Sequence, residues 1–191
     1  MSFEQQIRDL CYTLNHKIQL NMLKKKVEAI CNRQVEREGY SMNLYLAMAS
    51  WAEVNGMAGV AGWLYAQAEE EKLHMLKFIR YINERGGKAV IPAFQKPPVD
   101  FKDVETMFRD VLKHEQYVTA SINEIVDLTL AEKDFNTHNF LQWFVMEQVE
   151  EEASAQAILD KLSLGGKNIL YQFDRDIMSF RAQPGQGQPA L

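Results

Sequence analysis

The amino-acid sequence predicts an all-α protein: a four-helix bundle with one long crossover between its second and third helices, plus a short fifth helix near the C-terminus. Three observations lead to this prediction. Apolar residues recur at helical spacing along four long segments. Glycine and proline gather between those segments, where they end helices and form loops. No segment alternates as a strand does, and no repeat of about 20 to 50 residues is present.

The first long helix is expected at residues 23–53, which contain no proline and a single glycine, Gly39. A break at residues 55–59 separates it from the second helix, which ends at Gly86-Gly87 because glycine favours a helix stop. The inward stripe of the first helix comprises Val27, Ile30, Gln34, Glu38, Tyr45 and Ala49. The stripe of the second comprises Leu64, Ala68, Glu71, Met75, Phe78 and Ile82.

Residues 87–102 form the predicted crossover, because three prolines prevent a continuous helix there. About 15 residues of extended chain, at roughly 3.3 Å each, reach the far end of a long helix. The third helix can therefore run parallel to the second, and it begins near Asp103 with favourable acidic residues and ends at about residue 131. Its stripe comprises Val104, Phe108, Val111, Glu115, Val118, Ile122 and Val126.

A polar break at residues 132–134 precedes the fourth helix, which stops at Gly165-Gly166. Short loops make the first two and the last two helices antiparallel hairpins. The stripe of the fourth helix comprises Phe140, Phe144, Glu147, Glu151, Ser154, Ile158 and Leu162. A short helix follows at 168–180. We expect one main domain at residues 23–180, an N-terminal extension at 1–22 with a possible amphipathic helix, and a disordered tail at 181–191.

Composition narrows the classes of function. The 21 Lys and Arg residues against 26 Asp and Glu residues give a net charge of −5, which argues against a general nucleic-acid binder. The two cysteines form no Cys-x-x-Cys array, so zinc and iron–sulfur sites are not expected. No apolar run approaches the roughly 20 residues of a membrane span, and the N-terminus lacks the apolar core of a signal peptide. We therefore predict a cytoplasmic protein without membrane partners.

Carboxylates interrupt the apolar stripes of all four long helices. A buried carboxylate must take up a proton, pair with a cation or bind a metal ion, and the stripes offer no Lys or Arg as a partner. Glu71 and His74 stand three residues apart, so both can reach one ion from one helical face. Alone this motif is weak evidence, because a solvated pair is the commoner explanation. The interrupting acids on all four helices are Glu38, Glu71, Glu115, Glu147 and Glu151.

Oxygen-rich ligation with a single imidazole suits iron or manganese. Two ions that share a bridging carboxylate would use five acids and one histidine, close to a di-iron bundle with a Glu from each of two helices and Glu-x-x-His from the others. A second Glu-x-x-His is missing here. Gln148 and Glu151 have that spacing on the fourth helix.

Over residues 23 to about 180 the chain resembles the non-haem bacterial ferritins. Its motifs fall in the order and spacing of that family. They are Glu38-Gly-Tyr40-Ser41 with Tyr45, Glu70-Glu71-Lys-Leu-His74, Glu115-Gln116, and Asn139-Phe-Leu-Gln-Trp143 through Glu147-Gln148-Val-Glu150-Glu151.

The resemblance implies a role for each matching residue. One iron is bound by Glu38, Glu71 and His74, and Glu71 bridges to a second iron held by Glu115 and Glu151. Gln148 lies beside the pair, where it either contacts metal or donates a hydrogen bond to a ligand. The resemblance also implies a third iron position, formed by Glu70, Glu147, Glu150 and Glu151. Tyr45 matches the tyrosine that serves as a one-electron donor in the family.

The resemblance also implies an activity and an assembly. The expected protein is a ferroxidase that oxidises Fe²⁺ to Fe³⁺ with O₂ or peroxide and deposits ferric mineral inside a cage of twenty-four identical subunits. The missing second Glu-x-x-His argues against a bacterioferritin, and the nine methionines are more typical of core packing than of haem ligation, so no haem is expected. His114 and His138 are predicted to be surface or loop residues.

Two alternatives stay open at this point. The first is a non-catalytic iron-binding cage subunit that depends on another chain for oxidation. The second is a di-iron enzyme that reduces peroxide without storing iron. Residues 1–22 have no counterpart in the short N-termini expected of the family, so their role is not assigned.

Overall fold

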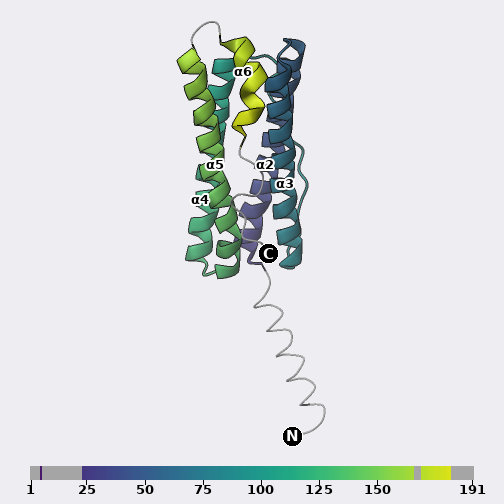
Figure 1. Ribbon diagram of the computed structural model, residues 1–191. Coiled ribbons are helices and arrows are strands. Elements are labelled where there is room, and N and C mark those ends of the chain that lie inside the picture. Colours follow the sequence, from purple (N-terminus) through teal and green to yellow (C-terminus); the bar gives the residue numbers. More distant parts are fainter. Residues whose placement is uncertain (1–4, 6–22, 166–168, 182–191) are drawn as a thin grey trace.

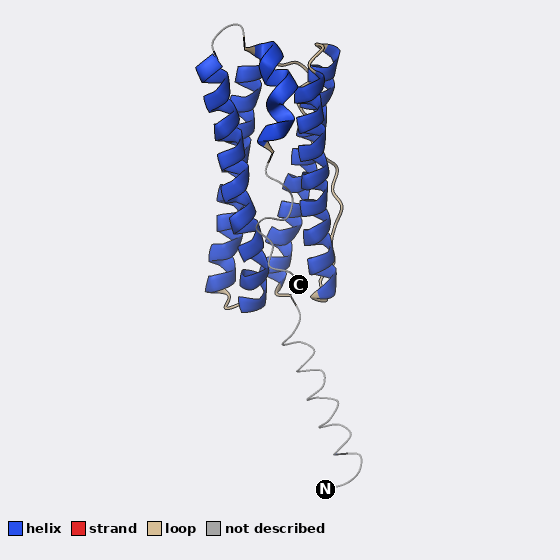
Figure 2. Ribbon diagram, viewed as in Figure 1, coloured by secondary structure: helices blue, strands red, loops and turns tan. Residues whose placement is uncertain are grey.

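The computed structural model describes residue 5 and residues 23–165 and 169–181, and the predicted fold class is confirmed (Figure 1). Four long helices lie side by side, and no strand occurs among the described residues (Figure 2). The long helices are α2 (Lys25–Val54), α3 (Ala58–Glu84), α4 (Val104–Ala131) and α5 (Phe135–Gly165). A short helix, α6 (Leu170–Asp176), continues into a 3₁₀ turn, η2 (Ile177–Phe180).

A long crossover connects the two helical hairpins, as the prolines predict. It runs between the C-terminal end of α3 and the N-terminal end of α4, along the side of the bundle (Figure 1). Phe94 of this segment packs against Gly39 of α2 so closely that a Cβ at position 39 would lie 2.2 Å from the phenyl ring. The single glycine of α2 therefore lies where the crossover needs close approach to the helix backbone.

Acidic residues fix both ends of the turn that joins α4 to α5. Asp134 accepts hydrogen bonds from the backbone N–H and hydroxyl of Thr137, at 3.2 and 2.7 Å, and so caps the start of α5. Glu132 forms an ion pair with Lys26 at 2.8 Å, which ties this turn to the start of α2. Lys133 between them has φ of 55°, the left-handed conformation that closes the turn.

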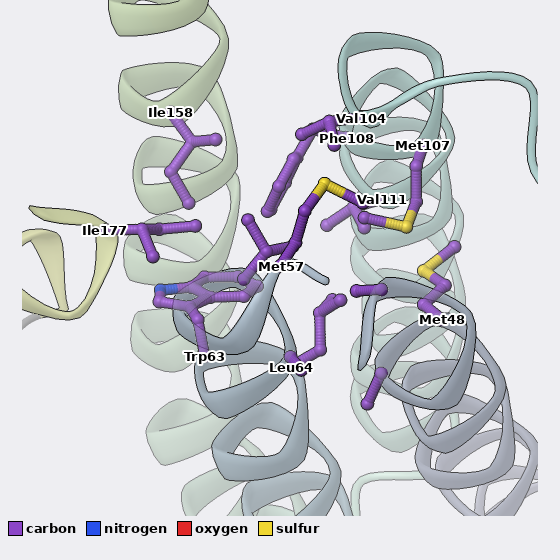
Figure 3. Packing of buried hydrophobic residues seen from close by; sticks show 14 of the residues in the cluster. Met48, Met57, Trp63, Leu64, Val104, Met107, Phe108, Val111, Ile158 and Ile177 are labelled. Carbon is purple, nitrogen blue, oxygen red and sulfur yellow. The ribbon is translucent and has the colours of Figure 1, made fainter. Parts of the chain in front are cut away.

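The hydrophobic core is divided into two clusters along the bundle. Figure 3 shows the cluster near α6, where Trp63 and Phe108 meet edge to face with ring centroids 5.4 Å apart. The second cluster fills the other half of the bundle, and in it Phe78 packs on Phe144 at 4.3 Å between ring centroids. The buried carboxylates lie on the stretches of helix between the two clusters. The two apolar clusters thus enclose a polar layer.

The C-terminal elements pack on the face formed by α3 and α5 (Figure 1). Phe173 and Ile177 are buried in the cluster near α6. The backbone at Gly59 approaches so closely that a Cβ there would meet the Asp174 carbonyl oxygen at 1.7 Å. The predicted fifth helix therefore exists, but it tightens into a 3₁₀ turn over its last four residues.

Some predictions concern residues that the structure does not describe. The N-terminal extension lies outside the described residues except for residue 5, and the tail does so beyond Arg181. Within the described part of the chain, none of the helices combines the length and the apolar character needed to cross a membrane.

Candidate metal centre

Three side chains from two helices converge in the polar layer. Glu38 projects from α2, while Glu71 and His74 project from successive turns of α3. His74 Nδ1 lies 4.0 Å from Glu38 Oε2 and 3.8 Å from Glu71 Oε2. One ligand atom from each of the three residues lies within 4.8 Å of the others. These distances allow a single cation to contact all three side chains.

The two carboxylate oxygens that face His74 have no hydrogen-bond partner. Glu38 is 1% exposed and Glu71 is 2% exposed, and the unpartnered atoms are the Oε2 of each. An unpaired buried carboxylate oxygen is costly because it has lost water and gained nothing in return. A cation placed between these oxygens and the imidazole nitrogen would remove that cost.

Two further carboxylates, Glu115 of α4 and Glu151 of α5, complete the acidic layer. The Tyr45 hydroxyl donates to Glu115 Oε1, and Gln148 Nε2 donates to Glu115 Oε2 at 3.3 Å. Gln67 Nε2 donates to Glu151 Oε2 at 2.7 Å. Neutral donors thus orient both groups, and among the described residues neither Lys nor Arg pairs with any of the buried acids Glu38, Glu71, Glu115 and Glu151.

The crowding of buried acids raises their pKa values. Burial raises the pKa of Glu38 and Glu71 well above the usual value, and nearby carboxylates raise both further. Burial also raises the pKa of Glu115, and burial together with the charge of Glu115 raises the pKa of Glu151 to about 8. Without a cation the layer therefore retains protons at neutral pH. A divalent cation would displace these protons.

The raised pKa values predict how the metal-free protein responds to pH. A carboxyl whose pKa is higher in the folded state keeps its proton better there, so its contribution to stability is present at low pH and is lost as pH rises from about 4.5 towards about 8. We expect the unfolding free energy of the chelator-treated protein to fall across this window, by at most about 1.4 kcal/mol per pH unit for each such group. Denaturant unfolding at a series of pH values measures it.

The matched control for this pH dependence is Glu151→Gln, because the amide can still accept the hydrogen bond from Gln67 but cannot ionise. This variant should show a shallower loss of stability between pH 6 and 8. An unfolding free energy that rises with pH over that window, in the absence of metal, would contradict the assignment of raised pKa values.

A network behind Glu38 fixes its orientation. Gln34 Nε2 donates to Glu38 Oε1 at 2.9 Å, and Ser121 donates to Gln34 Oε1. Arg37 Nη1 then donates to the Ser121 hydroxyl at 2.8 Å. Gln34 lies on the inward stripe that the sequence predicts, but the sequence pattern assigns it no role. Its position one turn before Glu38 was the available signal, since residues four apart share a helix face.

The structure changes two details of the sequence prediction. His114 is neither a loop residue nor fully exposed: it lies half-buried on α4, with Nε2 2.7 Å from the Ser41 hydroxyl, and burial lowers its pKa to about 4. Glu147 is half-buried at the edge of the layer, whereas its neighbour Gln148 is buried. The inward face of α5 is therefore rotated by one residue from the predicted stripe at this level.

A second acidic cluster adjoins the centre on the side of α3 and α5. A cavity of about 40 Å³ is lined by Trp63, Gln67, Glu70, Glu147, Glu150, Glu151, Ser154 and Arg181. Thus the four acids predicted for a third position do line one space. Glu151 belongs to both the cavity and the buried layer.

These residues suit the binding of divalent cations. The four buried carboxylates Glu38, Glu71, Glu115 and Glu151, with the single imidazole of His74, offer hard oxygen donors and one nitrogen donor, the combination favoured by iron and manganese. His74 packs edge to face on Trp143 and Phe144, with ring centroids 5.4 and 5.8 Å away, which fixes the plane of its ring. Aromatic packing therefore holds His74, and hydrogen bonds hold Glu38, Glu115 and Glu151.

Comparison with known proteins also points to a protein that binds iron. The ferritin-like domain family matches residues 28–165. A bacterial non-haem ferritin from Campylobacter jejuni is 42% identical over 158 residues, covering 82% of this chain and 95% of the relative. A probable bacterial non-haem ferritin-like protein from Haemophilus influenzae is 41% identical over 158 residues, covering 82% of this chain and 96% of that protein.

A solved structure is similarly close. The open-pore ferritin from the archaeon Archaeoglobus fulgidus aligns with a TM-score of 0.81 and 41% identity, and the alignment covers 84% of this chain and 98% of that one. The match with the ferritin-like domain covers well over half of the 191 residues, and the curated relatives are matched over almost their whole length. The chain belongs to the ferritin family.

Proposed function

We propose that this protein is an iron-storage ferritin with ferroxidase activity. The observation that carries the proposal is the pair of unpartnered carboxylate oxygens, on Glu38 and Glu71, which face His74 Nδ1 in a buried layer of acids. Such an arrangement is costly in a purely structural bundle. It is favourable where a cation passes through, and the named relatives are ferritins.

Iron is the substrate of this centre. Glu38, Glu71 and His74 hold one Fe²⁺, and Glu71 bridges to a second Fe²⁺ held by Glu115 and Glu151. Each ion gives up one electron, and O₂ or H₂O₂ accepts the pair. Anionic oxygen ligands stabilise Fe³⁺ over Fe²⁺, which favours this oxidation. Gln148 orients Glu115 through its amide, as its hydrogen bond of 3.3 Å supports.

The oxidised iron leaves towards the third position, formed by Glu70, Glu147, Glu150 and Glu151. From there it is deposited as ferric mineral inside a cage of twenty-four identical chains in the cytoplasm. The ferritin names of the relatives support storage. Glu151 belongs to both the buried layer and the acidic cavity, which supports a path from the centre to the third position.

Tyr45 provides a separate prediction. Its hydroxyl is buried and donates to Glu115, and burial raises its pKa well above the usual value, so it remains a neutral phenol next to the centre. Tyr45→Phe keeps the ring but removes a hydrogen bond to a carboxylate, worth about 1.5–3 kcal/mol. We expect two Fe²⁺ still to bind and the first turnover to slow by roughly tenfold. Stopped-flow oxidation after anaerobic loading measures this, and an unchanged rate would exclude Tyr45 from the reaction.

The proposed function is tested by following iron oxidation and iron retention in the same sample. The purified full-length protein is mixed with an excess of Fe²⁺ in air, and the products are separated by size. We expect oxidation faster than in buffer and Fe³⁺ that elutes with a large particle. Oxidation at the buffer rate would favour the non-catalytic cage subunit. Fast oxidation by a monomer or dimer that retains only two irons would favour the enzyme without storage.

A further inference from the structure

A positively charged side chain occupies the acidic cavity beside the metal centre. Arg181 Nη2 lies 2.6 Å from Glu70 Oε2, and Arg181 Nη1 lies 2.7 Å from Gln67 Oε1. Gln67 in turn donates from Nε2 to Glu151 Oε2 at 2.7 Å. The guanidinium is therefore connected to two of the four carboxylates of this cavity, directly to Glu70 and through one amide to Glu151.

The position of Arg181 is set by the packing of the C-terminal elements. The Val60 N–H donates to Asp174 Oδ1 at 2.8 Å, which anchors α6 on α3. Lys161 Nζ lies 4.2 Å above the ring of Phe180, immediately before Arg181. The Arg181 side chain is only 16% exposed as a result. This arginine is a fixed component of the cavity wall, although its sequence context resembles a polar tail.

The cavity retains polar capacity that the arginine does not use. About 40 Å³ of space remains among the lining residues, which is enough for a single ion or water molecule. Trp63, 2% exposed, lines the same cavity, and its Nε1 has no hydrogen-bond partner. Glu147 and Glu150 line the space without an ion pair among the described residues. A cation would therefore find the carboxylates of Glu147 and Glu150 here, while the indole N–H of Trp63, which is only a donor, suits a water molecule.

We propose that Arg181 is a built-in counter-cation of this cavity, which an iron ion must displace to enter from the ferroxidase centre. This inference rests on the proposed function and names the residue that controls the exit side of the centre. A guanidinium and a divalent ion that compete for Glu70 repel each other at a few ångströms. Arg181 thereby weakens the third metal position and keeps it from trapping iron on its way to the interior.

The number and affinity of bound ions test this inference without any turnover. The full-length protein is titrated anaerobically with Fe²⁺ and the heat of each binding step is recorded. In Arg181→Gln we expect the third ion per chain to bind about tenfold more tightly than in the unmodified protein, because a competing charge is lost. The first two ions should bind as before, because Arg181 forms no direct hydrogen bond or ion pair with any of their proposed ligands and reaches Glu151 only through the amide of Gln67.

The matched control is Arg175→Gln. Arg175 lies in the same C-terminal segment and pairs with its neighbour Asp176 at 2.7 Å, with a side chain 63% exposed and outside the cavity. This variant removes the same charge from the chain and should leave all binding steps unchanged. Arg181→Lys, which keeps the positive charge, should retain the weak third step. Adding Glu70→Gln to Arg181→Gln should reverse the gain.

An equal third-ion affinity in Arg181→Gln and the unmodified protein would overturn the inference, and so would an equal gain in Arg175→Gln or Arg181→Lys. Particle size and the thermal unfolding midpoint show that each variant is folded. The first two binding steps test the proposed function separately. Their absence from the unmodified protein would overturn that function and the inference that rests on it, whereas two normal steps followed by an unchanged third step in Arg181→Gln would overturn only the role of Arg181.

Discussion

The Glu71→Gln variant should lose rapid Fe²⁺ oxidation, by at least about 100-fold relative to the unmodified protein. Glu71 lies 3.8 Å from His74, and the charges of Glu115 and Glu151 act on it within the same buried layer, which fits its proposed role as the bridge between the two iron positions. The amide retains the size and shape of the side chain but not its negative charge. Stopped-flow oxidation of a sample loaded anaerobically with two Fe²⁺ per chain measures the loss.

Glu69→Gln is the matched control. It makes the same substitution two residues earlier on α3, where Glu69 pairs with Lys72 at 2.9 Å with a side chain 70% exposed. This control should oxidise iron at the unmodified rate, because it lies outside the acidic layer. If Glu71→Gln oxidised iron as fast as Glu69→Gln, the centre would lie elsewhere in the protein.

The second large effect concerns stability. Two ions that bind only the folded protein stabilise it by about 2.7 kcal/mol each at a free concentration 100 times the dissociation constant, hence by roughly 5 kcal/mol together. We expect this increase in the unfolding free energy when Fe²⁺ is added anaerobically at pH 7. The cation also removes the cost of the unpaired oxygens on Glu38 and Glu71, and this relief is part of the dissociation constant, where it appears as tighter binding.

Glu71→Gln should change which protein has the larger unfolding free energy, depending on whether metal is present. Without metal this variant should be at least as stable as the unmodified protein at pH 7 to 8, because a buried carboxyl that resists ionisation is replaced by a neutral amide. With metal it should gain little. Denaturant unfolding with and without Fe²⁺ measures both. An equal metal-dependent gain in both proteins would show that the cations bind outside this layer.

Much of the fold could be predicted from the sequence because each segment carries a consistent signal. The stripes of α2 to α5 have helical spacing, and prolines at 92, 97 and 98 leave no alternative to a crossover. The start of the 3₁₀ turn at Ile177 could not be predicted, since it depends on how α6 packs against α3. Gly39 likewise had no explanation until Phe94 was placed beside it.

The proposed ligands could be predicted because a carboxylate on an apolar stripe contradicts its surroundings. Glu38, Glu71 and Glu115 stand out in this way, and the structure buries all three in one layer. Residues that act through hydrogen bonds give no such contrast. Gln67 was missed because a glutamine beside a helix face fits both surface and core. Arg181 was assigned to the tail because Gln, Gly and Pro follow it.

His114 is more buried than the helical pattern predicts. Its neighbour Glu115 is 1% exposed, in agreement with the predicted stripe. The sequence predicts a surface or loop position for His114, because no ligand-spaced acid shares a buried face with it. The structure places it against Ser41 of α2, at the seam between two helices. Contacts across a seam depend on the distance between helices, which no single stripe encodes.

One measurement tests the central claim most directly: the amplitude of the fast phase of oxidation as Fe²⁺ is added to the anaerobic protein and O₂ is then admitted. The claim is that Glu38, Glu71, His74, Glu115 and Glu151 form one two-ion oxidation centre. It predicts a fast phase that grows with added iron, saturates at two Fe²⁺ per chain and disappears in Glu71→Gln. A fast phase that saturates at one ion, or that persists unchanged in Glu71→Gln, would contradict it.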